Sequence, residues 1–426
     1  MEFSRNINCL GTFDVLVAGA GPAGLCAAVS VARMGKSVLL IERYGIVGGC
    51  LTSGFVGPMM GGISSGTMST ELNELLNDGT GMHHDVEQAK IKLISWLEQE
   101  NVKVLLGCPV VDVITEECKI CGVIVGTQSG LKSISAKIVI DATGDGVVSY
   151  LAGAPTEMGR DDGKVQPATI MFTIENIDEK QTIVCYHEED DTVLPNGNYL
   201  QLCRDANKTG ELPKEINIIR LYRTAYSKTS RMVNATQING INGLEPESIA
   251  YAETQLRKQM HTVVNFLRKN VWGFENCRIQ HSSTMVGIRE TRRVIGEYIL
   301  TAEDLIAGKK FESAVVHNAY FDIDIHNPDG AGQAESDTIP VSVKSYDIPY
   351  EALVPLKIDN LITCGRCISG THRAHASYRV MNIASATGQA AGVAAALCIE
   401  TDNTPRNMDV KKVQTALINY GVHLFD

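Results

Sequence analysis

Three glycines near the N-terminus have the type and spacing needed to hold a phosphate group. Gly19, Gly21 and Gly24 form a G-x-G-x-x-G turn. The first glycine of such a turn permits a sharp exit from a strand, the second lets backbone approach a pyrophosphate, and the third lets a helix pack closely. Glu42 follows at a place where a carboxylate can accept hydrogen bonds from ribose hydroxyls. Together these residues predict a dinucleotide site.

The elements around this turn follow the order that a dinucleotide-binding fold requires. Residues 13–18 are an apolar, β-branched run that predicts a buried parallel strand. Residues 25–34 predict an Ala-rich helix that ends at Gly35, and residues 37–41 predict a second strand that leads to Glu42. The N-terminus of the helix would present free N–H groups to phosphates. An ordinary glycine turn without a ligand is therefore the less favoured interpretation.

A second glycine-rich stretch favours FAD over NAD as the bound cofactor. Gly48 and Gly49 lie just after Glu42, where NAD dehydrogenases have no general need for glycine. Here the chain resembles the FAD-dependent oxidoreductases with the glutathione-reductase-type FAD-binding fold, which are distantly related to fumarate reductase flavoproteins and to the A subunit of heterodisulfide reductase. The resemblance implies that FAD is the cofactor and that this glycine pair passes beside its pyrophosphate and flavin ring.

Three later segments extend the resemblance. A strand at 137–140 leads into D-A-T-G-D-G, a strand at 102–106 precedes Val110, and a strand at 360–364 precedes G-R-C-I-S and then R-V-M at the start of a small-residue helix. In the resembling fold that helix points its N-terminus at the flavin N1–C2=O, where it would stabilise the reduced ring. The predicted cofactor contacts are Gly19, Gly21, Pro22, Ala23, Gly24, Glu42, Arg43, Gly48, Gly49, Cys50, Leu51, Thr52, Val110, Ala142, Thr143, Gly144, Gly365, Arg366, Arg379, Val380 and Met381.

The catalytic candidates lie between the G-R-C turn and this helix. Flavin chemistry is hydride transfer at N5, so the protein must hold a substrate C–H near N5 and often supplies one acid or base. His372 and His375 are two histidines in four positions. A structural hydrogen bond is the alternative role for each. Arg373 and Arg379 could bind a substrate carboxylate or a flavin carbonyl, since an arginine fork matches a carboxylate.

A second polar cluster, G-I-R-E-T-R-R-V-I-G at 287–296, closely resembles a segment of the same family. On a strand, Arg289, Thr291 and Arg293 would share one face, while Glu290 and Arg292 would share the other. Only part of the cluster can then face a ligand. We expect Arg289 to contact substrate and the remaining charges to include a structural ion pair.

The cysteines indicate free thiols and no metal centre. The chain has 12 cysteines, scattered rather than packed into a short scaffold, which favours a reducing, cytoplasmic setting. Cys50 lacks the close partner of a redox disulfide, so a packed, inert thiol is the favoured interpretation. The C-x-x-C pairs at 118–121 and 364–367 lack the tight four-cysteine run of an iron–sulfur cluster. No second G-x-G-x-x-G is present for NAD(P)H.

Composition and charge limit the remaining function classes. A net charge of −11 argues against nucleic-acid binding, and so against an RNA-modifying flavoprotein, because such proteins need clusters of Lys and Arg. We find no signal peptide and no apolar stretch of the ~18–20 residues that span a bilayer. A length of 426 residues exceeds one hydrophobic core. The sequence therefore predicts a cytoplasmic protein with two or three domains and no membrane contact.

The predicted fold class is α/β. A Rossmann-like FAD-binding domain, with a parallel sheet, helices and a β-meander, is expected over residues 1–154 and 346–426. An α+β substrate or cap domain is inserted over 155–345, with a helix at 247–270 and strand-like alternation at 321–326 and 348–350.

Together, these features predict an FAD-dependent oxidoreductase that transfers a hydride between a small polar substrate, such as a carboxylate, and flavin N5. The alternative is an electron-transfer flavoprotein subunit that works with a partner protein. The substrate, the electron acceptor or donor and the oligomeric state are left open by the sequence.

Overall fold

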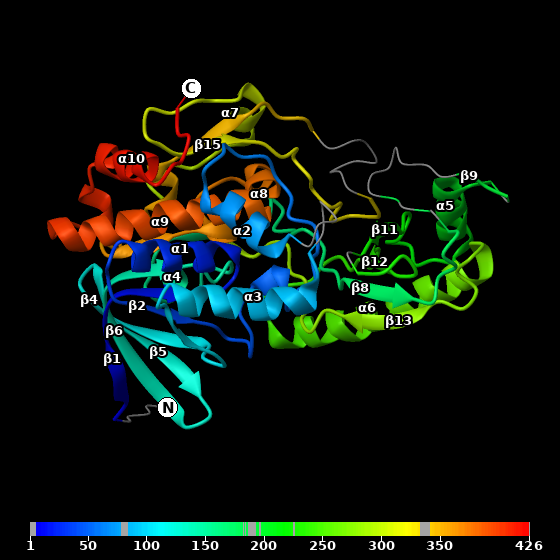
Figure 1. Cartoon of the computed structure of the whole chain (residues 1–426), viewed down its shortest axis with the longest axis horizontal. Coiled ribbons are helices and arrows are strands. Elements are labelled where there is room, and N and C mark those ends of the chain that lie inside the picture. The colour runs from blue at the N-terminus through cyan, green and yellow to red at the C-terminus, as the bar shows by residue number, and fades with distance from the viewer. Residues whose placement is uncertain are drawn as a thin grey trace.

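The computed structural model describes residues 6–77, 84–181, 183, 185, 193–195, 197–224, 226–332 and 341–425. Within them the chain forms two lobes (Figure 1). The first lobe contains the N- and C-terminal thirds and carries the largest sheet. The second lobe, on the right of Figure 1, is built from the middle of the chain.

The sheet of the first lobe has seven strands in the order β3-β2-β1-β6-β5-β4, with β17 also paired to β6. Their bounds are β1 Asn8–Ala18, β2 Val38–Ile41, β3 Lys103–Leu105, β4 Val110–Glu116, β5 Lys119–Thr127, β6 Gly130–Asp141 and β17 Leu361–Thr363. Strands β1, β2, β3 and β17 join the parallel part, whereas β4, β5 and β6 form an antiparallel meander. This confirms the predicted α/β class and its meander.

The parallel register brings several strand ends to one edge. Ala18 lies opposite both Ile41 and Asp141, and Thr363 also lies opposite Asp141. In open α/β sheets, ligands bind outside the carboxyl ends of the strands. The loops that follow these residues include the glycine turn, Glu42 and the segments at 142–146 and 364–367, so the sheet gathers segments that are far apart in sequence.

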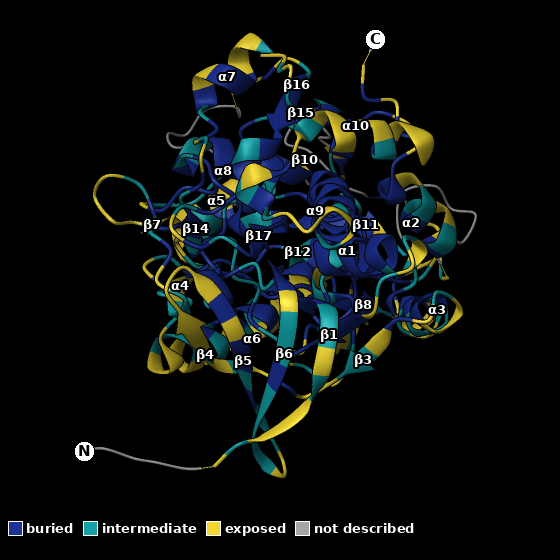
Figure 2. Ribbon diagram, turned by 90° about the vertical axis from the view of Figure 1, so that its left-hand side faces the viewer, coloured by how far each residue is buried: buried dark blue, intermediate teal, exposed yellow. Residues whose placement is uncertain are grey.

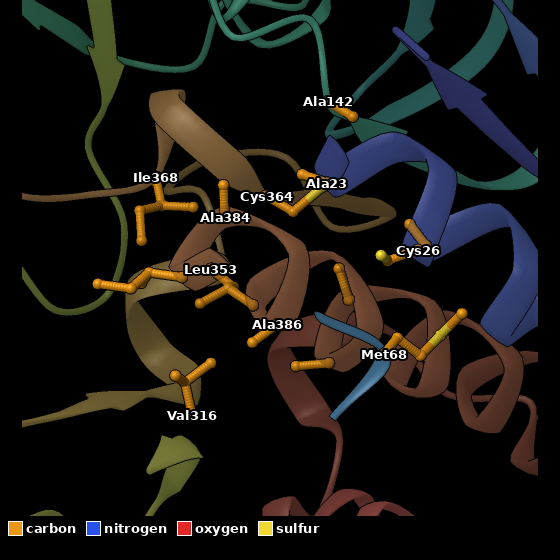
Figure 3. Close-up of a cluster of buried hydrophobic side chains, with 14 of the residues drawn as sticks. Ala23, Cys26, Met68, Ala142, Val316, Leu353, Cys364, Ile368, Ala384 and Ala386 are labelled. Carbon is orange, nitrogen blue, oxygen red and sulfur yellow. The ribbon is translucent and has the colours of Figure 1, made fainter. Parts of the chain in front are cut away.

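Two helices pack closely in the centre of this lobe. They are α1 (Pro22–Arg33) and α9 (Met381–Thr401). A Cβ on Gly388 would lie 2.0 Å from the Ala23 carbonyl oxygen, so only glycine permits this approach. Figure 3 shows the small side chains of Ala23, Ala384 and Ala386 that fill the space around the two helices. Helix α1 begins three residues before the predicted start because Pro22 suits a first helical turn.

Helix α9 is also long and apolar enough, by length and composition alone, to cross a membrane, contrary to the expectation of no such stretch. However, 83% of that stretch is buried inside the protein. Figure 2 shows α9 and α1 as the dark blue centre of the first lobe. We therefore assign α9 to the hydrophobic core. The cytoplasmic location stays a prediction.

The second lobe contains a four-stranded antiparallel sheet in the order β11-β12-β8-β13, covered by the long helix α6. The bounds are β8 Phe172–Glu175, β11 Arg220–Arg223, β12 Arg231–Asn234, β13 Arg278–Ser282, α5 Tyr199–Thr209 and α6 Pro246–Asn270. Phe172, Val233 and Leu256 belong to a hydrophobic core separate from that of the first lobe. We call this second lobe the cap below, after the predicted cap domain; that role stays a prediction.

The division at 155–345 stays a prediction, and part of that segment packs with the first lobe. Leu300, Leu305 and Val316 lie in the same hydrophobic cluster as α1 and α9. Strand β7 pairs with β14, and β15 pairs with β16. The bounds here are β7 Thr156–Met158, β14 Arg292–Val294, α7 Ala302–Ala307, β15 Ala314–Ala319, β16 Tyr346–Pro349 and α8 His372–Tyr378.

Peripheral elements complete the described chain. They are α2 Met68–Leu76, α3 Val86–Gln99, α4 Val147–Leu151, α10 Val410–Asn419, β9 Val193–Leu194, β10 Gly197–Asn198 and the 3-10 turns Gly49–Leu51, Tyr350–Leu353, Gly365–Cys367 and Pro405–Asn407.

Two strand predictions were wrong. Residues 321–326 form no strand, and only Ile323 makes an isolated bridge, to Val341. In the polar cluster, only Arg292 to Val294 are extended as a strand, so the expected alternation of faces from Arg289 onward fails. The reason is local: side-chain hydrogen bonds of this segment replace the ladder of a sheet, as described below.

Candidate functional site

A cavity of about 250 Å³ lies at the carboxyl edge of the parallel strands. Most of the predicted cofactor contacts line it, from segments that the sheet brings together. These are Gly19, Gly21, Pro22, Ala23, Glu42, Arg43, Gly49, Cys50, Val110, Ala142, Thr143, Gly144, Gly365, Arg366, Arg379 and Met381. The wall also contains residues that the sequence did not single out, namely Ile41, Tyr44, Cys108, Pro109, Val147, Met285 and Ala384.

Five predicted contacts lie outside this wall: Gly24, Gly48, Leu51, Thr52 and Val380. They support the wall instead of lining it. The Thr52 hydroxyl donates to the Val47 carbonyl oxygen at 2.5 Å, which ties the loop together from behind. Gly48 donates its amide to the Ala20 carbonyl oxygen at 2.7 Å and so fixes this loop to the glycine turn. A glycine-rich turn needs both kinds of position, so the spacing in the sequence could not separate lining residues from supporting ones.

The glycine turn separates these two roles clearly. A Cβ on Gly24 would lie 1.8 Å from the Gly19 carbonyl oxygen, so glycine there permits the turn itself to fold. A Cβ on Gly21 would meet nothing within 4 Å, so glycine there leaves space in the cavity. Helix α1 begins at Pro22 beside this space, and its first amides have no partner within the helix. A diphosphate can occupy this position.

Glu42 is held rigidly at the edge of the cavity. Its Oε2 accepts the Ala20 amide at 2.8 Å and its Oε1 accepts the Tyr44 amide at 2.9 Å. The side chain is buried. Because each carboxylate oxygen can accept more than one hydrogen bond, Glu42 retains acceptor sites for hydroxyl groups.

Asp145 joins two arginines of the wall. Arg366 contacts one of its carboxylate oxygens at 2.5 Å and Arg43 contacts the other at 3.2 Å. The Thr291 hydroxyl also donates to Asp145, at 2.9 Å. Burial opposes ionisation of Asp145, but Arg366, Arg43 and these hydrogen bonds outweigh it and lower its pKa. Nη1 of Arg366 is buried and has no partner in the described part of the protein, which leaves a donor for a ligand.

The Cys50 thiol faces the cavity and has no sulfur partner among the described cysteines. Loss of hydration raises the pKa of this thiol, although the positive charges of Arg366 and Arg379 act in the opposite direction. A raised pKa leaves the thiol protonated and a poor nucleophile. This geometry agrees with the interpretation of Cys50 as an inert lining group.

Arg379 lies at the cap side of the cavity and belongs to a second group of polar side chains. Its Nη2 donates to the Asp324 carbonyl oxygen at 3.1 Å and approaches Asp324 Oδ2 at 3.4 Å. Nε of Arg379 and Oδ1 of Asp324 are buried and have no partner in the described chain. His326 Nε2 lies 3.7 Å from the same Oδ2. Burial opposes the charge of Asp324, but His326 and the arginines hold its pKa well below its usual range.

Arg289 completes this cap-side group, which we define as Arg289, Asp324, His326 and Arg379. Nη1 of Arg289 donates to the Pro167 carbonyl oxygen at 2.7 Å. Burial, together with the positive charges of Arg379 and Arg220, lowers the pKa of Arg289 to about 9, so it stays charged at neutral pH. Burial and Arg289 lower the pKa of His326 to about 3, so that ring is neutral.

The sequence did not nominate Asp324, His326 or Arg220. The D-I-D-I-H alternation of residues 322–326 predicted a strand, yet these residues form an irregular segment whose polar side chains face Arg379 and Arg289. The available signal was the density of ionisable residues in an apolar segment. Their partners come from three other parts of the chain, which no local pattern shows.

Two catalytic candidates lie elsewhere. His372 and Arg373 were expected beside the bound cofactor, but both line a different cavity. The cause is a buried carboxylate: Glu290 Oε1 accepts from His372 Nδ1 at 2.8 Å and from Arg293 at 2.5 Å. Glu290 and Arg293 are thus the structural ion pair expected in the 287–296 segment. His375 is buried and lines neither cavity.

The C-x-x-C pairs do not gather with other ligands. Cys118 and Cys121 are exposed on the β4–β5 hairpin, whereas Cys364 and Cys367 are buried, and burial raises the pKa of both buried thiols. Among the residues that the structure describes, no group of three or more His, Cys, Asp or Glu side chains could hold a metal ion.

Comparisons with known proteins agree with this geometry. The family described as FAD dependent oxidoreductase matches residues 14–417. A thiamine thiazole synthase of Methanococcus aeolicus is 34% identical over 31% of this chain and 54% of its own length. Digeranylgeranylglycerophospholipid reductase 1 of Methanococcoides burtonii is 28% identical over 43% of this chain and 50% of its own. The chain thus spans about half the length of the curated relatives it matches.

Two solved structures share the fold over almost the whole chain. A geranylgeranyl bacteriochlorophyll reductase-like protein of Thermoplasma acidophilum has a TM-score of 0.50 at 15% identity, covering 97% of this chain and 84% of that one. The p-nitrophenol 4-monooxygenase of Pseudomonas putida has a TM-score of 0.51 at 8% identity, covering 96% and 85%. At these identities the likeness establishes the fold alone.

The cavity fits FAD, the cofactor that the family match indicates. The space at Gly21 and the amides of α1 suit a diphosphate, the acceptors of Glu42 suit ribose hydroxyls, and the N-terminus of α9 at Met381 lines the far end of the cavity. The buried Nη1 of Arg366, which has no partner in the described chain, is a donor that acceptors of such a ligand can meet.

Proposed function

Because the chain belongs to the family of FAD-dependent oxidoreductases, we propose that it transfers a hydride between its cofactor and a small polar substrate that carries a carboxylate. FAD supplies the hydride chemistry, at N5 of its isoalloxazine ring. The composition of the cap-side group is the observation that supports a carboxylate on the substrate. Two half-buried arginines, Arg289 and Arg379, lie there beside Asp324, and Arg379 also lines the cofactor cavity.

In this proposal the arginines bind the substrate and set its orientation. A planar guanidinium pairs with a carboxylate through parallel hydrogen bonds, and such bonds are strong where water is excluded. Arg379 offers the buried Nε donor, which has no partner in the described chain. The lowered pKa of Arg289 means that its charge is poorly compensated before binding, so an anion beside it is favoured.

Asp324 and His326 are the proposed hydrogen-bond acceptors of the cap-side group. Asp324 is ionised and His326 is neutral at pH 7, because their pKa values lie well below the usual ranges. Such low pKa values make both groups weak bases, so in this proposal they accept a hydrogen bond from a substrate hydroxyl or amino group, without taking its proton, while the arginines hold the carboxylate.

The test is the visible spectrum of the purified holoprotein during anaerobic incubation with small carboxylic acids, each matched to its neutral alcohol or amide. We expect bleaching of the flavin bands by an acid and not by its neutral match. An Arg289→Gln variant should bind FAD normally but require much more acid for bleaching. Arg278→Gln, at an exposed arginine paired with Glu175 in the cap, is the matched control.

Bleaching by neutral donors alone would contradict the carboxylate proposal. A yellow protein that no small molecule bleaches, but that a partner protein reduces, would favour the alternative of an electron-transfer subunit.

A further inference from the structure

A second cavity, of about 700 Å³, opens to solvent and shares no lining residue with the cofactor cavity. Its wall is formed by β7, the start of α7 and the first residues of α8. Among its lining side chains are His372, Arg373 and Arg293. The hydride-transfer reaction proposed above assigns no role to this cavity or to the two histidines of α8.

His372 is oriented by Glu290 toward this second cavity. The Glu290 carboxylate accepts hydrogen bonds from Arg293, from the backbone N–H of Gln166 at 3.1 Å and from His372 Nδ1. A carboxylate that accepts fixes the tautomer with hydrogen on Nδ1 and a lone pair on Nε2. His372 is 6% exposed, and its Nε2 has no partner in the described chain. A buried nitrogen without a partner is costly unless water or a proton donor meets it.

His375 lies one helical turn after His372 on α8, and its carbonyl oxygen accepts the amide of Arg379 at 3.1 Å. Because His372 lines the second cavity and Arg379 lines the cofactor cavity, His375 stands between the two walls. The charges that act on its ring come from Arg379 and Arg366, in the wall of the cofactor cavity, and from Arg293 and His372, in the wall of the second cavity. Burial and these four groups hold the pKa of His375 well below its usual range, so the ring is neutral. It is 1% exposed, and its Nδ1 also lacks a partner in the described chain.

We propose that His375 and His372 form a proton path between the cofactor cavity and the open second cavity. Oxidation of a substrate releases one C–H hydrogen as a hydride to FAD and one O–H or N–H proton. The path carries this proton to solvent. His375 accepts the proton on one ring nitrogen and releases another from Nδ1. His372 takes up a proton on Nε2, is held as an imidazolium by the Glu290 carboxylate, and releases the proton from Nε2 to water in the second cavity. Water between the two unpartnered nitrogens would satisfy both and connect the rings.

The structure offers a test that separates a proton path from a packing role. His372 borders the open cavity, so added imidazole can reach the space left by His372→Ala. His375 is enclosed, so imidazole cannot reach the space left by His375→Ala. His261→Ala, at an exposed histidine of α6, is the matched control.

The experiment reduces each holoprotein anaerobically with a light-driven external donor and follows proton uptake with a pH-indicator dye. We expect His372→Ala and His375→Ala to slow proton uptake at least about tenfold. Millimolar imidazole should restore the rate for His372→Ala alone. If either alanine variant loses FAD, the corresponding asparagine variant replaces it, and slow uptake is again expected.

Unchanged uptake in both variants, or a slow His372→Ala that imidazole does not restore, would overturn the proton path. The proposal rests on the redox function of the bound cofactor, but this measurement needs no substrate. A failure to find a carboxylate substrate therefore affects the proposed function and not this test.

Discussion

The cofactor cavity and the cap-side group are built by different means, although they adjoin at Arg379. The cofactor cavity depends on backbone: a glycine turn, helix N-termini and amides that hold Glu42 in place. The cap-side group depends on side chains from separate segments, whose charges act on one another in a partly buried position. Backbone geometry forms the cofactor site, whereas in our proposal side-chain charge determines which substrate binds. Changes in the two regions should therefore have separable effects.

The largest effect is expected at Gly24. A Cβ there would collide with the Gly19 carbonyl oxygen, so Gly24→Ala should distort the turn, lose FAD and destabilise the protein by about 1–3 kcal/mol. Gly21→Ala should fold normally and weaken FAD binding alone, because its Cβ enters open space in the cavity. Thermal unfolding without FAD and a titration with FAD distinguish the two. Gly45→Ala, which meets nothing within 4 Å, is the control. Equal stability of the two apoproteins would contradict the separation of support from space.

Asp145→Asn should cost about 1–2 kcal/mol, since it leaves Arg366 and the half-exposed Arg43 without the carboxylate between them while solvent screens part of the loss. The pKa of Asp145 is lowered in the folded protein. Its contribution is therefore fully present above the unfolded pKa and is lost as pH falls through the folded pKa. The difference in unfolding free energy between wild type and Asp145→Asn should be constant near pH 7 and shrink below about pH 4. A difference that grows on acidification would contradict this assignment.

Arg289→Gln should raise the dissociation constant of a bleaching carboxylate about 30-fold, equivalent to about 2 kcal/mol, and leave FAD affinity unchanged. The reason is that Arg289 lies outside the cofactor cavity wall. Parallel titrations with the acid and with FAD measure both effects. Loss of FAD in this variant would show that the two regions are not separable.

The smallest effect is expected at Cys50. Because the raised pKa keeps this thiol protonated, Cys50→Ser should change the rate of flavin bleaching less than about twofold. Stopped-flow reduction of both proteins checks this. A rate that falls with the serine would make Cys50 a redox or proton-transfer group.

The same contrast explains what the sequence could predict. The first β-α-β unit follows from local patterns, because the alternation and spacing of residues within a strand, turn or helix are visible in the sequence. The meander, the G-R-C turn, the position of α9 and most later residues of the cofactor cavity were predicted from the resemblance to the family. Asp324 and His326 were missed because their neighbours Arg379 and Arg289 are distant in sequence. His372 was misplaced because Glu290, from another segment, binds its ring and turns it to the second cavity.

The most direct test of the account is a titration of the apoprotein with FAD, followed by the visible spectrum after gel filtration, for wild type and Gly21→Ala. We predict stoichiometric FAD with the wild type, and weakened retention by a Gly21→Ala variant of unchanged thermal stability. A wild-type protein that takes up no FAD, or a Gly21→Ala variant that retains it as tightly, would contradict the assignment of this cavity to the cofactor.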